Sequence, residues 1–185
     1  GKEIEIEAPE NAHEHGIGMI FQELSLVPQL DVAKNIFLGN ESKRKLPFLN
    51  DKEMYDRAKE LMTKYNVREY FSVKDRISKL SRGYCQIVEV LKALSRDTKI
   101  LIMDEPTASL TKEEEETLYQ IILNLKAQGV SIIYISHRLE EIFKNCDRVT
   151  VFRDGNKVDT KEIDSVNMEQ LIELMTGRKL QVEEQ

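Results

Sequence analysis

The sequence predicts an α/β fold, in which strands alternate with helices to build a parallel sheet and a helical segment is inserted between two strands. Two observations lead to this fold class. Short aliphatic runs alternate with stretches of helical periodicity over residues 99–185. Residues 23–98 separate this region from an earlier aliphatic run and show mainly helical periodicity. We therefore divide the chain into residues 1–22, 23–98 and 99–185.

The composition is that of a globular domain with a hydrophobic core. The 185 residues include 27 Lys and Arg against 33 Asp and Glu, a net charge of −6, and 41% of them are hydrophobic. The negative net charge gives no general attraction to nucleic acid, so we expect no nucleic-acid partner. Two cysteines are too few for a disulfide framework or a structural zinc site. Because the acidic start also lacks the apolar stretch of a signal peptide, we expect reduced thiols in the cytoplasm.

The first region predicts two strands. Residues 2–7 alternate charged and aliphatic side chains, which indicates a half-exposed strand that Pro9 ends. Residues 16–21 form a short apolar run, Gly16-Ile17-Gly18-Met19-Ile20-Phe21, and we expect a buried strand there that stops at Gln22.

Two helices are predicted in the second region, and each begins at a polar cap. Asp51 is the expected N-cap of one helix and Ser81 that of the other. Apolar residues at helical spacing follow each cap and define the buried face. They are Met54, Ala58, Leu61, Met62 and Tyr65 in the first helix, and Ile87, Val90, Leu91 and Leu94 in the second.

The third region predicts strands separated by helices. The unbroken aliphatic runs 99–103 and 130–135 are typical of strands that are buried on both faces of a sheet. Between them, Thr111 and Glu114 form a capping box that begins a helix, and Gly129 ends it. These elements together predict a parallel sheet covered by helices on both faces.

The rest of the third region predicts a helix, a hairpin and a final helix. Asp154-Gly155 is a hairpin turn signal, and Asn167 with Gln170 forms the cap of the last helix. The elements expected are a helix over 138–145, strands over 148–152 and 156–160, and a last helix that Gly177 ends.

Polar residues follow both central strands. Asp104 and Glu105 come directly after the run 99–103, and His137 comes shortly after the run 130–135. Taken alone, the Asp-Glu pair is typical of a strand end that faces solvent, but a second polar strand end beside it favours a ligand site. Ligands bind beyond the carboxyl ends of parallel strands, so we expect His137 near Glu105. One carboxylate suits Mg²⁺, the other suits activation of a water, and the imidazole suits a phosphate oxygen.

The segment Leu80-Ser81-Arg82-Gly83 is a further candidate because it opens a helix. Ser81 offers a hydroxyl, and Gly83 permits a close approach of the backbone. The N-terminus of a helix attracts anions. Without the other motifs, this segment is typical of an ordinary serine cap.

Taken in order, these motifs resemble those of the ATP-binding-cassette (ABC) ATPases. Gln22 resembles the Q-loop, residues 80–83 the signature loop, Asp104-Glu105 the end of the Walker B strand, residues 108–111 the D-loop, and His137 the H-loop. The resemblance covers essentially the whole chain. It implies a P-loop NTPase-like core with an inserted helical subdomain, and ATP and Mg²⁺ as cofactors.

Three stretches are most similar to the cassettes of carbohydrate importers of the ribose and galactose type. They are residues 16–24, 35–39 and 171–178. Two cassettes are commonly fused in that subfamily, and the chain resembles the first of them. The sequence departs from the family pattern where Arg82 and Tyr84 replace Gly and Gln of the signature loop and Thr111 replaces Asp of the D-loop. These departures concern residues expected to face a second cassette.

The phosphate-binding loop Gly-x-x-x-x-Gly-Lys-Ser/Thr does not occur in the 185 residues, whose only Gly-Lys is Gly1-Lys2. Family members carry that loop upstream, together with the aromatic residue that stacks on adenine. We therefore expect a cassette truncated after its Walker A helix. The loop supplies the amides, the lysine and the hydroxyl that hold phosphates and Mg²⁺, so the isolated chain is expected neither to bind nor to hydrolyse ATP normally.

The resemblance implies a role for each site residue. Glu105 would activate the attacking water, and His137 would contact the γ-phosphate. Asp104 and Gln22 would help to hold Mg²⁺, largely through water. These roles belong to the complete protein, in which two cassettes sandwich ATP head to tail.

The resemblance also implies partners. Ser81 and Gly83 would contact the nucleotide that is bound on a second cassette. Residues 23–98 would dock on membrane-spanning permease subunits, with Gln22 coupling the docking to the ATP site. ATP hydrolysis would then drive the import of a sugar, which a sugar-binding protein delivers, from a peripheral position on the inner face of the cell membrane.

Two other classes of function stay open. Heads of DNA-repair and chromosome-structure ATPases share these motifs but carry a long coiled coil before the signature, whereas the segment between Gln22 and Leu80 is compact and lacks heptads. The importer-like stretches also disfavour a cassette that acts on ribosomes. A non-catalytic fragment that only binds a partner is the preferred account of the isolated chain.

Overall fold

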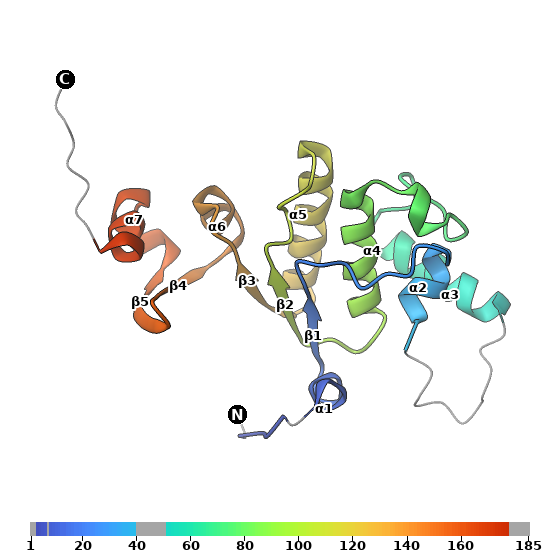
Figure 1. Ribbon diagram of the computed structural model, residues 1–185, viewed down its shortest axis with the longest axis horizontal. Coiled ribbons are helices and arrows are strands. Elements are labelled where there is room, and N and C mark those ends of the chain that lie inside the picture. Colours follow the sequence, from blue (N-terminus) through green and yellow to red (C-terminus); the bar gives the residue numbers. More distant parts are fainter. Residues whose placement is uncertain (1–2, 7, 40–50, 178–185) are drawn as a thin grey trace. The chain divides into compact units, whose positions relative to one another are not determined.

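The computed structural model describes residues 3–6, 8–39 and 51–177 and confirms the α/β fold class (Figure 1). The chain divides into two compact units, residues 1–135 and 136–185. The three-part division expected from the sequence stays a prediction.

The two units contain the following elements. In chain order, the first unit contains α1 (Pro9–Glu14), β1 (Ile17–Ile20), α2 (Val32–Phe37), α3 (Asp51–Lys64), η1 (Ile77–Lys79), α4 (Arg82–Leu94), β2 (Ile100–Asp104), α5 (Lys112–Ala127) and β3 (Ser131–Ile135). The second unit contains α6 (Leu139–Asn145), β4 (Arg148–Arg153), β5 (Asn156–Glu162), η2 (Ile163–Ser165) and α7 (Met168–Thr176).

The first unit is built on a three-stranded sheet of order β1-β2-β3. Both pairings are parallel, with Ile17 of β1 opposite Ile100 of β2, and Ile100 opposite Ser131 of β3. The three strands run in the same direction in Figure 1. The residues that follow β1 and β2, among them Gln22 and Glu105, therefore leave the sheet at the same edge.

Gly16 fixes the start of the sheet. Its carbonyl accepts the backbone N–H groups of Lys99 and Ile100, at 2.7 and 3.0 Å. Its φ of +75° lies in the left-handed region, and a Cβ at this position would lie 2.9 Å from the carbonyl oxygen of Asp97. Only glycine combines this φ with such a close neighbour at little cost.

The two faces of the sheet differ in burial. Leu101 and Met103 of β2 are fully buried in a core that they share with α4 and α5, whereas Ile133 and Ile135 of β3 are 51% and 46% exposed. The prediction of burial on both faces is therefore wrong for β3, whereas β2 has no exposed residue. The aliphatic runs reflect the preference of β-branched residues for strands as well as burial, and the sequence does not separate the two.

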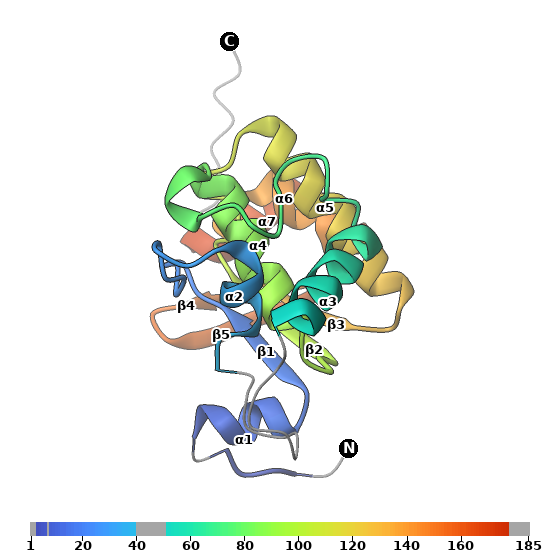
Figure 2. The ribbon, with the colours of Figure 1, turned by 90° about the vertical axis from the view of Figure 1, so that its right-hand side faces the viewer.

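Helices α2, α3 and α4 pack together, and α3 and α4 bury their predicted apolar faces (Figure 2). The buried residues are Met54, Ala58 and Met62 of α3, Ile87, Val90 and Leu91 of α4, and Tyr65 just after α3, whereas Leu61 and Leu94 are half-buried. The prediction that Asp51 is an N-cap is wrong, since Asp51 is the first helical residue of α3. Its carboxylate still interacts favourably with the positive end of the helix.

The prediction of a strand near the N-terminus is also wrong. Residues 3–6 form no strand and are exposed, and Lys2 and Glu7 lie outside the described residues. Pro9 begins α1 instead of ending a strand. Proline is favoured in the first turn of a helix, where its missing N–H would have no partner. Alternating charge and aliphatic character without a pairing neighbour is therefore a weak strand signal.

The second unit folds as its turn signals predict. Asp154 and Gly155, with φ of +52° and +75°, form the turn between antiparallel β4 and β5. The capping box of Asn167 and Gln170 begins α7, and Gly177 ends that helix in the left-handed conformation. Within the described ranges, no helix of either unit is long and apolar enough to cross a membrane.

Asp31 joins α2 to α3. Its Oδ1 accepts the backbone N–H of Lys34 at 2.9 Å and caps α2, and its Oδ2 accepts the hydroxyl of Tyr55 at 2.6 Å. The hydrogen bond to Asp31, together with burial and nearby negative charge, raises the pKa of Tyr55 to about 12 from its ordinary value of 10.0. Because the folded state raises this pKa, the contact stabilises the fold below pH 10, and the stabilisation is lost as the pH rises through about 12.

Asp31→Asn should return the pKa of Tyr55 toward 10.0. Asparagine is an equally good N-cap, so α2 keeps its cap while the acceptor charge disappears. The pKa is measured by NMR titration of the tyrosine ring carbons, and Tyr55→Phe assigns the resonance. A pKa of Tyr55 that stays near 12 in the Asp31→Asn protein would contradict this account.

Candidate functional site

The structure brings Gln22 and Glu105 together where β1 and β2 end. β1 ends two residues before Gln22, and β2 ends at Asp104. The side-chain Nε2 of Gln22 donates to Oε2 of Glu105 at 3.4 Å. Gln22 is exposed and Glu105 is half-buried. An amide and a carboxylate that are 83 positions apart in the sequence therefore meet at one surface edge of the sheet.

The backbone around Glu105 is fixed by the neighbouring strand. Its N–H donates to the carbonyl of Ile135 at 2.9 Å, and its carbonyl accepts the N–H of Ala108 at 3.3 Å. Its φ is +44°, in the left-handed region. A non-glycine residue in this region costs about 1–2 kcal/mol, and such residues concentrate at functional sites. Position and backbone strain therefore both single out Glu105.

Asp104 completes an oxygen-rich strand end. It is half-buried, pairs with Ile135 at the end of β3, and directly precedes Glu105. Among the described residues, no group of three His, Cys, Asp or Glu side chains could hold a metal ion. Mg²⁺ usually takes one or two protein oxygens and completes its shell with water and phosphate oxygens. The oxygens of Asp104 and Gln22 fit that requirement.

Ser81 begins α4, as the sequence predicts. Its Oγ accepts the backbone N–H of Tyr84 at 3.1 Å, and Ser81 is exposed. Gly83 follows in the first turn and is buried. In Figure 1 the N-terminal end of α4 lies at the end of the unit where the parallel strands finish. The hydroxyl of Ser81 and the strand-end residues thus share one end of the first unit.

Tyr84, one of two residues that depart from the expected signature loop, packs against its own chain. The ring of Tyr84 stacks on that of Tyr70, with centroids 5.5 Å apart and planes at 26°, and it lies tilted against Phe71 at 5.7 Å. Burial, with the nearby charges of Glu113 and Glu114, raises the pKa of the Tyr84 phenol. These contacts stabilise the start of α4 against Tyr70 and Phe71. A glutamine at position 84 has no ring and could not stack in this way.

Two α4 residues that we did not predict bind the segment after Gln22, which comprises residues 23–27. Oε1 of Glu89 accepts the backbone N–H of Ser25 at 2.5 Å, and Nζ of Lys92 donates to the hydroxyl and the carbonyl of Ser25 at 2.8 and 3.3 Å. Glu89 is buried. The sequence contains a signal for this contact, because Glu89 lies within the apolar face of a predicted helix and a buried acid needs partners. The helix that begins at Ser81 therefore also anchors the segment that carries Gln22.

Asn35 of α2 binds the same segment, and it is another residue that we did not predict. It is fully buried. Its Oδ1 accepts the N–H of Val27 at 2.7 Å, and its Nδ2 donates to the carbonyls of Val27 and Asp31 at 3.1 and 3.0 Å. A buried amide with this full set of partners fixes the chain path in one arrangement.

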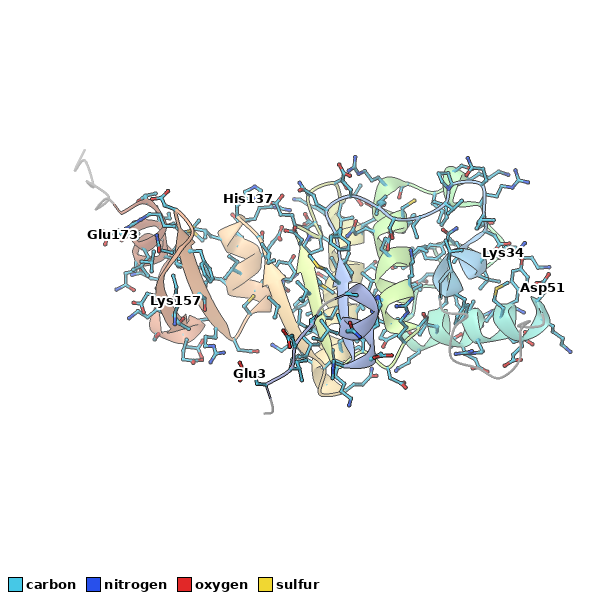
Figure 3. The ribbon with its side chains drawn as sticks, turned by 60° about the horizontal axis from the view of Figure 1, so that its bottom comes forward. Glu3, Lys34, Asp51, His137, Lys157 and Glu173 are labelled. Atoms are coloured by element: carbon cyan, nitrogen blue, oxygen red, sulfur yellow. The ribbon has the colours of Figure 1, made fainter. Side chains whose placement is uncertain are left out.

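His137 belongs to the second unit. It is exposed and lies between β3 and α6, where Figure 3 labels it. The turn around it is held by Ser136, whose Oγ accepts the N–H of Arg138 at 3.0 Å and lies 3.3 Å from Oε2 of Glu141. The expected nearness of His137 and Glu105 concerns both units and stays a prediction.

The fold is that of ATP-binding cassettes. One similar solved structure is a dimeric cassette in a post-hydrolysis state bound to ADP and Pi, with a TM-score of 0.71 and 23% identity over 85% of this chain and 68% of that chain. Another is a nucleotide-free cassette from an ABC transporter, with a TM-score of 0.73 and 20% identity over 91% of this chain and 68% of that chain. These similarities define the fold class.

The sequence comparisons identify the family. Residues 1–108, more than half of the chain, match the family described as ABC transporter, and the chain belongs to that family. It is 46% identical over 180 residues to the ribose import ATP-binding protein RbsA of Bacillus licheniformis. It is 44% identical over 181 residues to the protein of that name from Shouchella clausii. Each match covers 97% of this chain and 36% of the relative, so the chain spans about a third of their length.

Glu89→Ala should loosen the segment after Gln22 selectively. The substitution leaves the N–H of Ser25 without its charged acceptor, a loss of about 1.5–3 kcal/mol that corresponds to at least about ten-fold faster amide exchange over residues 23–27. Hydrogen exchange followed by mass spectrometry measures this change. Glu60→Ala, which removes an exposed glutamate of α3, is the control. Equal exchange in both variants would contradict the anchoring role of Glu89.

Proposed function

We propose that this chain is part of the ATP-hydrolysing component of an ABC importer for a sugar. The observation that carries the proposal is the meeting of Gln22 and Glu105 at the edge where β1 and β2 end. The names of the two relatives, both ribose import ATP-binding proteins, favour a pentose or a similar sugar as the transported substrate. The activity belongs to a longer protein, since the relatives are about three times as long as this chain.

Glu105 is the proposed general base. A carboxylate at the end of a central strand can orient and deprotonate a water that attacks the γ-phosphate. Gln22, whose amide nitrogen lies 3.4 Å from Oε2 of Glu105, can hold that water. Gln22 can also couple the presence of the water to the position of the segment after it, in which Ser25 is bound by Glu89. The left-handed backbone of Glu105 fixes the base relative to the sheet before the nucleotide binds.

Asp104 and Gln22 are the proposed protein contacts of Mg²⁺, largely through water. The donor set supports this assignment because both side chains offer oxygen atoms, the ligands that Mg²⁺ prefers. Bound Mg²⁺ would neutralise charge on the phosphates during transfer. The role of this chain is to hold the two oxygens at the strand end and to keep Glu105 beside them.

Ser81 and Gly83 are proposed to meet a nucleotide held by a second cassette. Ser81 is exposed, and its hydroxyl and the backbone N–H groups of Arg82 and Gly83 are of the donor type that phosphate oxygens accept. The dimeric cassette among the structural neighbours makes a paired arrangement reasonable. His137, in the second unit, is proposed to donate to the γ-phosphate of the nucleotide beside Glu105.

The proposed partners are membrane-spanning permease subunits, and a sugar-binding protein takes part indirectly. The surface of α2, α3 and the segment from Gln22 to Val27 is the proposed docking region, because the buried contacts of Glu89 and Asn35 tie that segment to the helices. The protein would then lie on the inner face of the cell membrane. The chain of 185 residues by itself is proposed to bind ATP poorly, because the phosphate-binding loop is absent from its sequence.

Glu105→Gln in the full-length protein should abolish turnover while ATP binding is kept. The amide retains the shape but cannot take up a proton, so we expect kcat to fall by about 10²–10⁴-fold. ATP affinity, measured by calorimetry, should stay within about three-fold, a difference of roughly 0.7 kcal/mol. Glu60→Gln, at an exposed position of α3, is the matched control. Unchanged turnover in Glu105→Gln would remove Glu105 from the role of base.

A further inference from the structure

Glu114, in the first turn of α5, is a buried carboxylate to which the proposed mechanism gives no role. Its exposed fraction is 5%, whereas the neighbouring Glu113 is exposed. A glutamate is almost never buried in this way without partners that compensate its desolvation. The partners of Glu114 therefore indicate what it does.

Three donors satisfy this carboxylate. The hydroxyl of Ser81 donates to Oε1 at 2.5 Å, and the N–H and hydroxyl of Thr111 donate to Oε2 at 2.8 and 3.0 Å. Burial raises the pKa of the Glu114 carboxyl, but the hydrogen bonds from Ser81 and Thr111 outweigh burial, so this pKa lies below its ordinary value. Glu114 is thus an anion that ties the start of α4 to the start of α5, two helix ends that lie close together in Figure 1.

Gly83 provides the space that the carboxylate occupies. A Cβ at Gly83 would overlap the carboxylate of Glu114. Any larger residue at position 83 would therefore push Glu114 away from Ser81. The glycine of the signature turn therefore leaves room for the contact between Glu114 and Ser81 within this chain, independently of any approach by a ligand.

The hydroxyl of Ser81 has a single proton, and Glu114 accepts it. The same oxygen already accepts the N–H of Tyr84 at 3.1 Å. Phosphate oxygens are acceptors, so a phosphate that contacts the Ser81 hydroxyl requires that proton. Glu114 and a nucleotide phosphate therefore compete for one donor, and their negative charges repel each other.

We propose that Glu114 is a positioning residue that holds Ser81 in a resting arrangement, and that the phosphate of a nucleotide on a facing cassette must displace it. The inference rests on the proposed function, in which Ser81 meets the nucleotide bound by a second cassette. Glu114 then sets the ATP concentration at which the two cassettes close. The rate of the chemical step depends on Glu105 and not on Glu114.

The substitution Glu114→Gln tests the competition for the Ser81 proton separately from the structural role of Glu114. Its amide oxygen can keep the hydrogen bonds from Thr111, and its amide nitrogen then faces Ser81 and donates to Oγ. The proton of the Ser81 hydroxyl becomes available to a phosphate, and the repulsive charge is gone. Glu113→Gln removes the same charge from the same turn and leaves the contact with Ser81 intact, so it is the matched control.

The test is steady-state ATP hydrolysis by the full-length protein carrying each variant. Glu114→Gln should lower the KM for ATP about ten-fold with kcat within about two-fold, because a charged competitor for the donor is lost. Glu113→Gln should leave KM within about two-fold. In a Ser81→Ala background, Glu114→Gln should change KM by no more than about two-fold, because no hydroxyl proton remains to be released and only the loss of charge repulsion is left. A purely structural role would lower kcat and thermal stability in both backgrounds alike.

An unchanged or higher KM in folded Glu114→Gln protein overturns the inference and leaves the proposed function standing, provided that the wild-type protein hydrolyses ATP. Absence of wild-type turnover overturns the proposed function itself. Where Glu114→Gln does not fold, wild-type protein labelled with ¹³C at its glutamate carboxyls gives a second measurement. A saturating non-hydrolysable ATP analogue should shift the Glu114 resonance as Ser81 leaves it, and a resonance that does not move overturns the inference.

Discussion

The parallel pairing of β2 with both of its neighbours is the constraint on which the candidate site depends. Because all three strands run in one direction, the residues after β1 and β2 reach the same edge, where Gln22 meets Glu105. The same ladder continues one residue further, from the N–H of Glu105 to Ile135, and holds Glu105 in a left-handed conformation. A register shift of one residue would turn every strand side chain to the other face and dismantle this edge.

Helix α4 connects this edge to the rest of the first unit. At its start, Ser81 is bound by Glu114 of α5, and two turns further on, Glu89 and Lys92 hold the segment that carries Gln22. The apolar face of α4 is buried in the same core as β2. Ser81 and the segment that carries Gln22 are therefore both held by one continuous helix and its buried hydrogen bonds.

Sequence reasoning predicted the parallel sheet, the caps of α4, α5 and α7, and the residues at the strand ends, because glycines, capping boxes and aliphatic runs act locally. It failed for the N-terminal strand and for the burial of β3, since both depend on what packs alongside. Glu89, Asn35 and the contact of Glu114 with Ser81 were missed for the same reason. Each joins segments whose proximity only the tertiary fold creates, although a buried acid on an apolar helix face was a usable signal.

We propose that this chain supplies the water-activating edge and the signature serine of a cassette, whereas the phosphates are held by a loop that is absent from its sequence. Calorimetric titration of Mg-ATP into the 185-residue chain tests this division of roles. We expect no saturable binding tighter than about 1 mM, equivalent to roughly −4 kcal/mol. Saturable binding in the micromolar range would contradict this proposal, because the 185 residues would then hold the phosphates without that loop.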